Sequence, residues 1–66
     1  MEIMLNGTAQ QIQEQATIAC LLSLRDLTNK PCAVEVNQQL VPKAMHEQHH
    51  LNSGDQVEIV TLVGGG

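Results

Sequence analysis

The chain has 66 residues, a formal net charge of −4, 42% hydrophobic and 15% charged residues, and no aromatic side chain. This size predicts one small domain, and the balance of apolar and charged residues argues against intrinsic disorder. The negative charge and the missing aromatic rings argue against nucleic acid as a partner, and no apolar segment approaches the length of a membrane span, so we expect no membrane partner either.

The first part of the chain predicts a β-hairpin. Within residues 1–5 every second residue is apolar, which is the period of a half-buried strand. Asn6-Gly7 comes next, and this pair favours a tight hairpin turn because both residues tolerate positive φ. We therefore expect a second strand over about residues 8–13, with Ile12 as its main inward residue and Gln10 on the same face.

The clearest helix signal covers residues 18–27. Thr17 is expected at the N-cap, where its hydroxyl can accept from a free backbone amide. Residues 29–31 are expected to end the helix, because the proline in this segment cannot continue the hydrogen-bond ladder. Apolar residues recur at helical spacing and are expected to pack on the sheet. They are Ile18, Leu21, Leu22, Leu24 and Leu27.

Two short strands are predicted after the helix. Val34 and Val36 alternate with polar residues, which indicates a third strand. A polar turn at residues 37–39 leads to the short segment 40–42. Proline at the end of that segment lacks a backbone N–H and confines it to an edge of the sheet.

The last part of the chain predicts a loop, a turn and a final strand. Residues 43–52 carry little periodicity and are expected to form a loop with at most one helical turn. The turn at 53–55 starts the last strand, in which Val57, Ile59 and Thr61 share one face and Glu58, Val60 and Leu62 point the other way. The resulting order β-β-α-β-β-β predicts an α+β fold, a mixed sheet of four to five strands with one main helix packed on one face.

Met4, Val60 and Leu62 form a candidate partner-binding patch. If the first and last strands are parallel neighbours, these three residues lie on the outward face and are expected side by side near the chain end. Exposed apolar patches of this kind tend to mark partner sites. The alternative is that the chain covers them, or that they are singly scattered apolar residues of the ordinary kind.

The predicted last strand runs into Gly64-Gly65-Gly66. Glycine has no Cβ, so this segment packs no side chain, and its bare backbone can pass down a channel that a side chain would block. Fully extended, three residues span about 10 Å. We expect residues 1–63 to form the domain and 64–66 a flexible tail, in which Gly64 and Gly65 thread into a partner and Gly66 presents its carboxylate. A frayed chain end is the alternative.

Three histidines near one another are the candidate metal ligands. His46, His49 and His50 lie beside Glu47, and imidazoles three residues apart can share a helix face. Cysteine is absent from this stretch, so no soft ligand completes a set. We expect a solvated polar loop and no metal site.

The two cysteines, Cys20 and Cys32, form neither a CxxC motif nor a disulfide framework. Cys20 is expected to pack as a small apolar residue on the predicted helix. Because the first residues also lack the pattern of a signal peptide, we expect a reducing, cytoplasmic compartment.

Three segments resemble the ThiS family, the sulfur carriers of thiamin thiazole biosynthesis. The similarity spans the whole chain, with Gln10 standing where the family usually has an apolar strand residue and Gln15 where a turn glycine is common. The three segments are 3–7 (IMLNG), 36–42 (VNQQLVP) and 54–60 (GDQVEIV), the last running into 63–66 (VGGG).

This resemblance implies a β-grasp, ubiquitin-like fold and chemistry at Gly66. A ThiF-type adenylating enzyme would use ATP to convert the carboxylate into an acyl-adenylate. Sulfur from a cysteine desulfurase or persulfide carrier would then give a thiocarboxylate, which a ThiG-type thiazole synthase would accept. The resemblance implies a protein co-substrate with no bound cofactor and no catalytic activity of its own.

Two other functions remain open. The small subunit of molybdopterin synthase is a related sulfur carrier, although this chain is shorter and lacks the proline pair that usually precedes the glycines in that family. A non-catalytic β-grasp interaction module would have the same fold and an idle tail. The chemical state of the terminal carboxylate after incubation with an adenylating enzyme distinguishes a carrier from a module.

Overall fold

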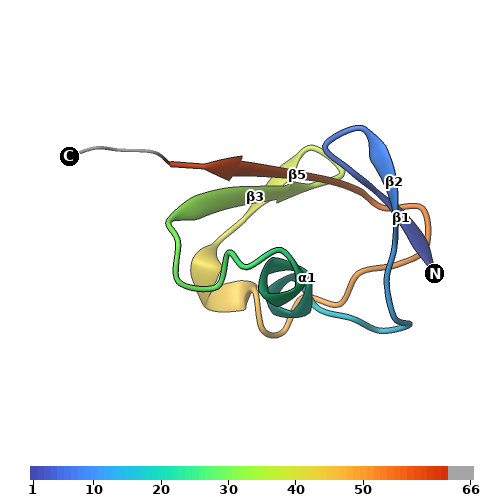
Figure 1. The fold of residues 1–66 in the computed structure, drawn as a ribbon, viewed down its shortest axis with the longest axis horizontal. Coiled ribbons are helices and arrows are strands. Elements are labelled where there is room, and N and C mark those ends of the chain that lie inside the picture. The colour runs from blue at the N-terminus through green and yellow to red at the C-terminus, as the bar shows by residue number, and fades with distance from the viewer. Residues whose placement is uncertain (63–66) are drawn as a thin grey trace.

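The computed structural model describes residues 1–62. Its five strands form one mixed sheet in the order β2-β1-β5-β3-β4, in which β1 and β5 are parallel and the other neighbours antiparallel. In Figure 1, α1 and η1 lie on the same side of this sheet. The elements are β1 (Glu2–Leu5), β2 (Thr8–Gln11), α1 (Ile18–Leu24), β3 (Cys32–Val36), β4 (Gln39–Val41), the 3₁₀ helix η1 (Lys43–Met45) and β5 (Gln56–Thr61).

The hairpin between β1 and β2 turns at the predicted residues. Asn6 and Gly7 both have positive φ, 50° and 83°, as a tight hairpin turn requires. The Asn6 side chain also reaches the neighbouring strand: its Nδ2 donates to the Ile59 carbonyl at 3.2 Å, and its Oδ1 accepts from the Ile59 amide at 2.8 Å. Asn6 therefore extends the pairing of β1 with β5 beyond the last residue of β1.

Strand β2 is two residues shorter than expected. It ends at Gln11, because the chain turns at residues 13–16, where Gln15 has φ 64° and the Ala16 amide donates to the Gln13 carbonyl at 3.2 Å. Ile12 still enters the core, as predicted. Gln15 adopts a left-handed conformation that glycine adopts without steric cost.

Helix α1 begins as predicted but ends earlier. Thr17 Oγ1 accepts from the Cys20 amide at 3.2 Å, which confirms the N-cap. At the other end of the helix Asp26 has φ 58°. The Asp26 amide donates to the Ser23 carbonyl, and the Leu27 amide donates to the Leu22 carbonyl at 2.8 Å. These two bonds are those of a Schellman motif, which ends the helix at Leu24, upstream of the proline segment.

The hydrophobic core lies between α1 and the sheet. Leu24 is not part of it: its side chain is 65% exposed, so the expectation that it packs on the sheet is wrong. Leu27 lies beyond the helix and packs against the core from its edge. Within residues 1–62 the buried hydrophobic residues of this core are Ile3, Leu5, Ile12, Ala16, Ile18, Leu21, Leu22, Val34, Val36, Val41, Leu51, Val57 and Ile59.

The segment between β4 and β5 was expected to contain at most one helical turn, and it contains η1. The same segment lies against the start of α1. The backbone carbonyls of His49 and His46 accept from the amides of Ile18 and Ala19 at 3.1 and 3.0 Å. Amides in the first turn of a helix have no partner within the helix. This loop therefore completes the N-terminus of α1. Neither helix within residues 1–62 combines the length and apolar character needed to cross a bilayer.

Candidate functional site

The predicted reactive group, the carboxylate of Gly66, lies outside the described residues, as do Gly64 and Gly65. The structure describes the strand that leads to them. β5 is the central strand of the sheet, between β1 and β3, and it ends at Thr61. The Leu62 amide then donates to the Pro31 carbonyl at 2.9 Å, so the chain is still held beside the start of β3 four residues before Gly66.

The beginning of β5 is fixed by a polar cluster around a buried carboxylate. Asp55 accepts from the Asn37 side chain at 3.0 Å and from the Asn52 amide at 2.8 Å. Asn37 in turn accepts from the Gln56 amide at 3.0 Å, and its own amide donates to the Gln56 carbonyl at 2.8 Å. The sequence indicated only a turn at Asn37, and this second role depends on a contact across 18 residues.

The three residues of the candidate patch do not stand side by side. β1 and β5 are parallel neighbours as expected, but Met4 is paired with Gln56, and Val60 lies four residues further along β5. Four strand residues span roughly 13 Å. Val60 and Leu62 are 57% and 55% exposed and lie toward the chain end, whereas Met4 is half-buried at the opposite end of β5. Their partner-binding role stays a prediction.

The three histidines lie in the loop between β4 and β5. His46 is buried, with Nε2 at 3.0 Å from the Val41 carbonyl oxygen, so the expected solvated position is wrong for this residue. His50 forms a β-bridge with Thr17 and is exposed. Within residues 1–62 no three His, Cys, Asp or Glu side chains converge as metal ligands.

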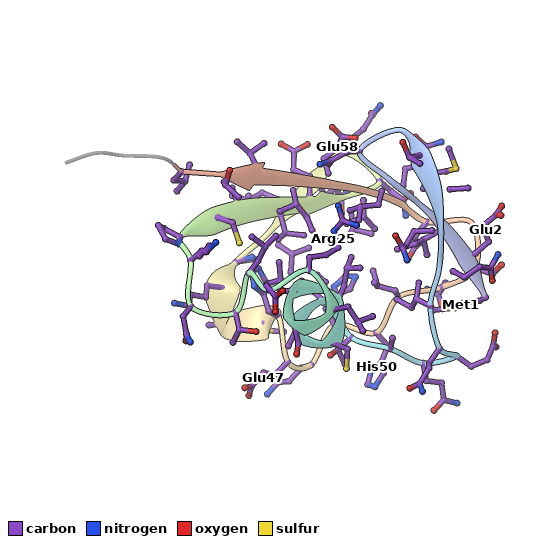
Figure 2. The ribbon with its side chains drawn as sticks, viewed as in Figure 1. Met1, Glu2, Arg25, Glu47, His50 and Glu58 are labelled. Atoms are coloured by element: carbon purple, nitrogen blue, oxygen red, sulfur yellow. The ribbon has the colours of Figure 1, made fainter. Side chains whose placement is uncertain are left out.

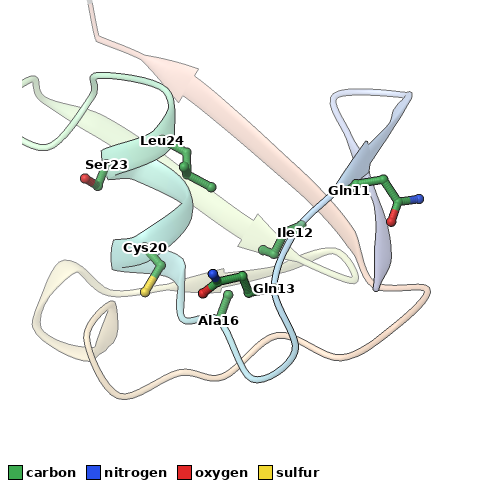
Figure 3. A pocket seen from close by; sticks show the side chains of 7 residues that line it. All are labelled: Gln11, Ile12, Gln13, Ala16, Cys20, Ser23 and Leu24. Atoms are coloured by element: carbon green, nitrogen blue, oxygen red, sulfur yellow. The ribbon is translucent and has the colours of Figure 1, made fainter.

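Cys20 is exposed, so the expectation that it packs as an apolar residue is wrong. It lies on the side of α1 that faces a groove of about 540 Å³ running from the end of β2 along the helix (Figure 3). The Thr17 hydroxyl donates to Sγ at 3.2 Å and lowers the pKa of the Cys20 thiol. The groove is lined by Gln11, Ile12, Gln13, Ala16, Cys20, Ser23 and Leu24.

Replacing Thr17 tests this contact. Thr17→Ala removes the hydroxyl, so the pKa of Cys20 rises, less thiolate is present at neutral pH, and alkylation by iodoacetamide slows. The variant also loses the N-cap and about 1 kcal/mol of stability. Thr17→Ser keeps the hydroxyl that contacts Sγ and keeps the N-cap, so this variant serves as the control. Alkylation of the Cys20 peptide is followed by mass spectrometry between pH 6 and pH 9, about the range in which thiols titrate. Equal rates in Thr17→Ala and the parent chain would contradict the contact.

A model of the ThiS family matches residues 3–66. The chain belongs to the ThiS family. The match confirms the family predicted from the sequence. The described residues form a five-stranded mixed sheet with one α-helix, which agrees with the β-grasp fold expected for this family.

Three known proteins illustrate the relationship. The crystal structure of the thiamine biosynthesis protein ThiS from Geobacter metallireducens superposes with a TM-score of 0.84, at 25% identity and with 100% of both chains covered. The sulfur carrier protein ThiS of Escherichia coli is 33% identical over 66 residues, covering 100% of both chains. A thiazole synthase of Paramagnetospirillum magneticum is 35% identical over the same 66 residues, which make up 20% of its length.

Proposed function

We propose that this chain is a sulfur carrier of thiamin biosynthesis, in which the carboxylate of Gly66 is adenylated and converted to a thiocarboxylate. The observation that carries the proposal is the end-to-end similarity to the sulfur carrier protein ThiS of Escherichia coli. The position of the glycines supports it, because they follow the central strand of the sheet with only Leu62 and Val63 between.

The chemistry begins with a carboxylate, which is a poor electrophile. A partner enzyme of the ThiF type would transfer AMP from ATP to the Gly66 carboxylate, and the acyl-adenylate provides AMP as a leaving group. The outer sulfur of a persulfide, supplied by a cysteine desulfurase or a persulfide carrier, would then displace AMP and form an acyl disulfide. A second thiol of the partner proteins would attack the S–S bond, which would release the thiocarboxylate and leave a disulfide on the partner side. In this scheme the chain is a co-substrate, and ATP is bound by the partner.

Thiazole formation is the proposed destination of the sulfur. The thiazole synthase of Paramagnetospirillum magneticum contains, within one fifth of its length, a segment similar to this whole chain. A carrier-like segment joined to a thiazole synthase supports a ThiG-type enzyme as the acceptor. Gly64 and Gly65 suit two successive active sites, because a backbone without Cβ atoms passes through narrow channels.

The domain provides the surface that both partners recognise. Val60 and Leu62 are exposed on or directly after β5, near the proposed reactive end, and are the first candidates for this contact. Met4 lies on the same outward face, about four residues away along the sheet. In this proposal the three residues contact a partner together only if its docking surface spans most of the length of β5.

Incubation with a ThiF-type enzyme, ATP and a persulfide donor tests the function. We expect the mass of the C-terminal peptide to rise by the difference between one sulfur and one oxygen atom. A variant with Cys20→Ser and Cys32→Ser is the control, because it retains the terminus and lacks every thiol. No mass change with a cognate enzyme favours the idle interaction module. Transfer to the large subunit of molybdopterin synthase, but not to thiazole synthase, favours the other carrier.

A further inference from the structure

The turn between β1 and β2 consists of Asn6-Gly7, a pair that is chemically labile as well as suited to a hairpin. Asparagine is a thermolabile residue, because the backbone nitrogen of the next residue can attack its side-chain amide carbon. Glycine as the next residue puts no side chain in the way of that attack. The space around Gly7 is open as well, since a Cβ built there would meet no heavy atom within 4 Å beyond its chain neighbours. Sequence and space therefore both favour deamidation of Asn6.

The folded backbone nevertheless keeps the two reacting atoms apart. Asn6 has φ 50° and lies in the left-handed region, where ψ is about +47°. At that ψ the Cβ atom and the nitrogen of the next residue are on opposite sides of the Cα–C bond. Ring closure needs them on the same side, which requires ψ to rotate by close to half a turn. Such a rotation destroys the hairpin turn.

Hydrogen bonds to β5 hold Asn6 in this conformation. Its Nδ2 donates to the Ile59 carbonyl at 3.2 Å, and its Oδ1 accepts from the Ile59 amide at 2.8 Å. The backbone amide of Asn6 donates to the Val57 carbonyl at 2.9 Å. Nδ2 is the nitrogen that leaves as ammonia in a deamidation, so its bond to Ile59 must break. The reaction therefore needs the hairpin to separate from β5.

We propose that Asn6 is a deamidation site that the folded sheet keeps unreactive and that reacts when the β1–β2 hairpin opens. The Gly7 nitrogen bonds to Cγ, the Cγ–Nδ2 bond breaks, and ammonia leaves with the proton of the Gly7 amide, which gives a succinimide. Water then opens the ring at Cγ to give aspartate, or at the backbone carbonyl carbon to give isoaspartate. Ammonia takes up the carboxylic proton. This inference is independent of the proposed function.

The products fit the sheet less well than asparagine does. Aspartate has no donor for the Ile59 carbonyl, and an oxygen would stand in place of Nδ2, 3.2 Å from that carbonyl oxygen. Glu58, the neighbour of Ile59 on β5, already carries a negative charge on the side of the sheet opposite α1 (Figure 2). Isoaspartate lengthens the main chain by one carbon within a two-residue turn. Deamidation therefore marks a chain that has opened and makes its refolding less favourable.

The rate of deamidation in the full-length chain tests the protection. The folded chain and a synthetic peptide of residues 3–10 are incubated in the same mildly alkaline buffer. Mass spectrometry of the Asn6 peptide follows the replacement of the amide NH2 by OH. We expect the folded chain to react at least about a hundredfold more slowly, because the open state is rare. At the urea midpoint half of the chains are unfolded, so the rate should rise to about half that of the peptide in the same urea.

Two variants on α1 test whether the opening depends on the core. β1 and β5 both contribute buried residues to the core, so weaker packing should expose Asn6 more often. Leu21→Ala should therefore deamidate faster than the parent chain, whereas Leu24→Ala, at an exposed position, should keep the rate of the parent. Equal rates in Leu21→Ala and the parent would contradict this coupling. A folded chain that reacts as fast as the peptide overturns the protection, and a peptide that does not react overturns the site.

Asn6→Asp reproduces the aspartate product and tests its effect on the sheet. Asp-Gly also suits this turn, so a loss of stability reports the missing donor and the added charge. We expect a lower urea midpoint than in the parent chain. The control is Asn29→Asp, which makes the same charge change in the exposed loop between α1 and β3 and should leave the midpoint nearly unchanged. Equal midpoints in Asn6→Asp and the parent would show that deamidation does not weaken the sheet.

Discussion

Deletion of Gly66 is expected to abolish the proposed thiocarboxylate formation and to leave the domain folded. The reacting carboxylate would then belong to Gly65, one residue and about 3.5 Å short of its position in the full chain. A displacement of about 1 Å at a reacting centre costs about a hundredfold in rate, so a whole residue should remove activity altogether. The fold should persist, because the core residues that the structure describes within 1–62 all lie between Ile3 and Ile59.

Two measurements on this variant separate chemistry from folding. Mass spectrometry of the C-terminal peptide reports sulfur loading, and a urea unfolding curve reports the free energy of unfolding. We expect loading to be undetectable and the curve to superpose on that of the full chain. Loading at the normal rate without Gly66 would show that the terminal glycine is not the acceptor. A lower unfolding midpoint would show that the tail contributes to the domain.

Leu21→Ala is expected to have the largest effect on stability. Leu21 is fully buried between α1 and the sheet, and removing a buried leucine side chain costs about 2–5 kcal/mol. A domain of this size has a total stability of roughly 3–10 kcal/mol at typical values per residue. The substitution should therefore remove a large part of the free energy of unfolding and lower the urea midpoint, as urea unfolding followed by circular dichroism will show.

Leu24→Ala is the matched control on the same helix. The two leucines are three residues apart, but Leu24 is exposed, and exposed substitutions usually change stability by no more than about 0.5 kcal/mol. Similar losses in the two variants would contradict the packing described for α1. This comparison also tests the most consequential difference between the helix expected from the sequence and the helix observed.

The end of α1 shows why the sequence predicted the helix but not its length. Residues 18–27 have apolar spacing that continues past Leu24, and no glycine marks the stop. The chain instead turns at Asp26, a residue that adopts positive φ less readily than glycine. The hairpin at Asn6-Gly7 was predictable for the opposite reason, since both residues of that pair favour the conformation that the turn needs.

Contacts across the sheet were less accessible from the sequence. The alternation of residues along each strand and the expected parallel direction of the two strands placed Met4 and Val60 on the outward face. The distance between them follows from the register of β1 against β5. That register involves the Asn6 side chain bound to the backbone of Ile59, 53 residues away. The hydrophobic pattern of each strand determines which residues share a face. It does not determine which residues of two strands far apart in the sequence stand opposite each other.

The chemical state of Gly66 in protein isolated from cells tests the central claim most directly. The chain is purified from cells that are making thiamin, without thiol-modifying reagents, and its C-terminal peptide is analysed by mass spectrometry. We predict two forms that differ by the replacement of one oxygen by one sulfur, with the difference located at Gly66. A terminus that is only ever a carboxylate, in cells whose thiazole synthesis depends on this chain, would contradict the proposed sulfur carrier.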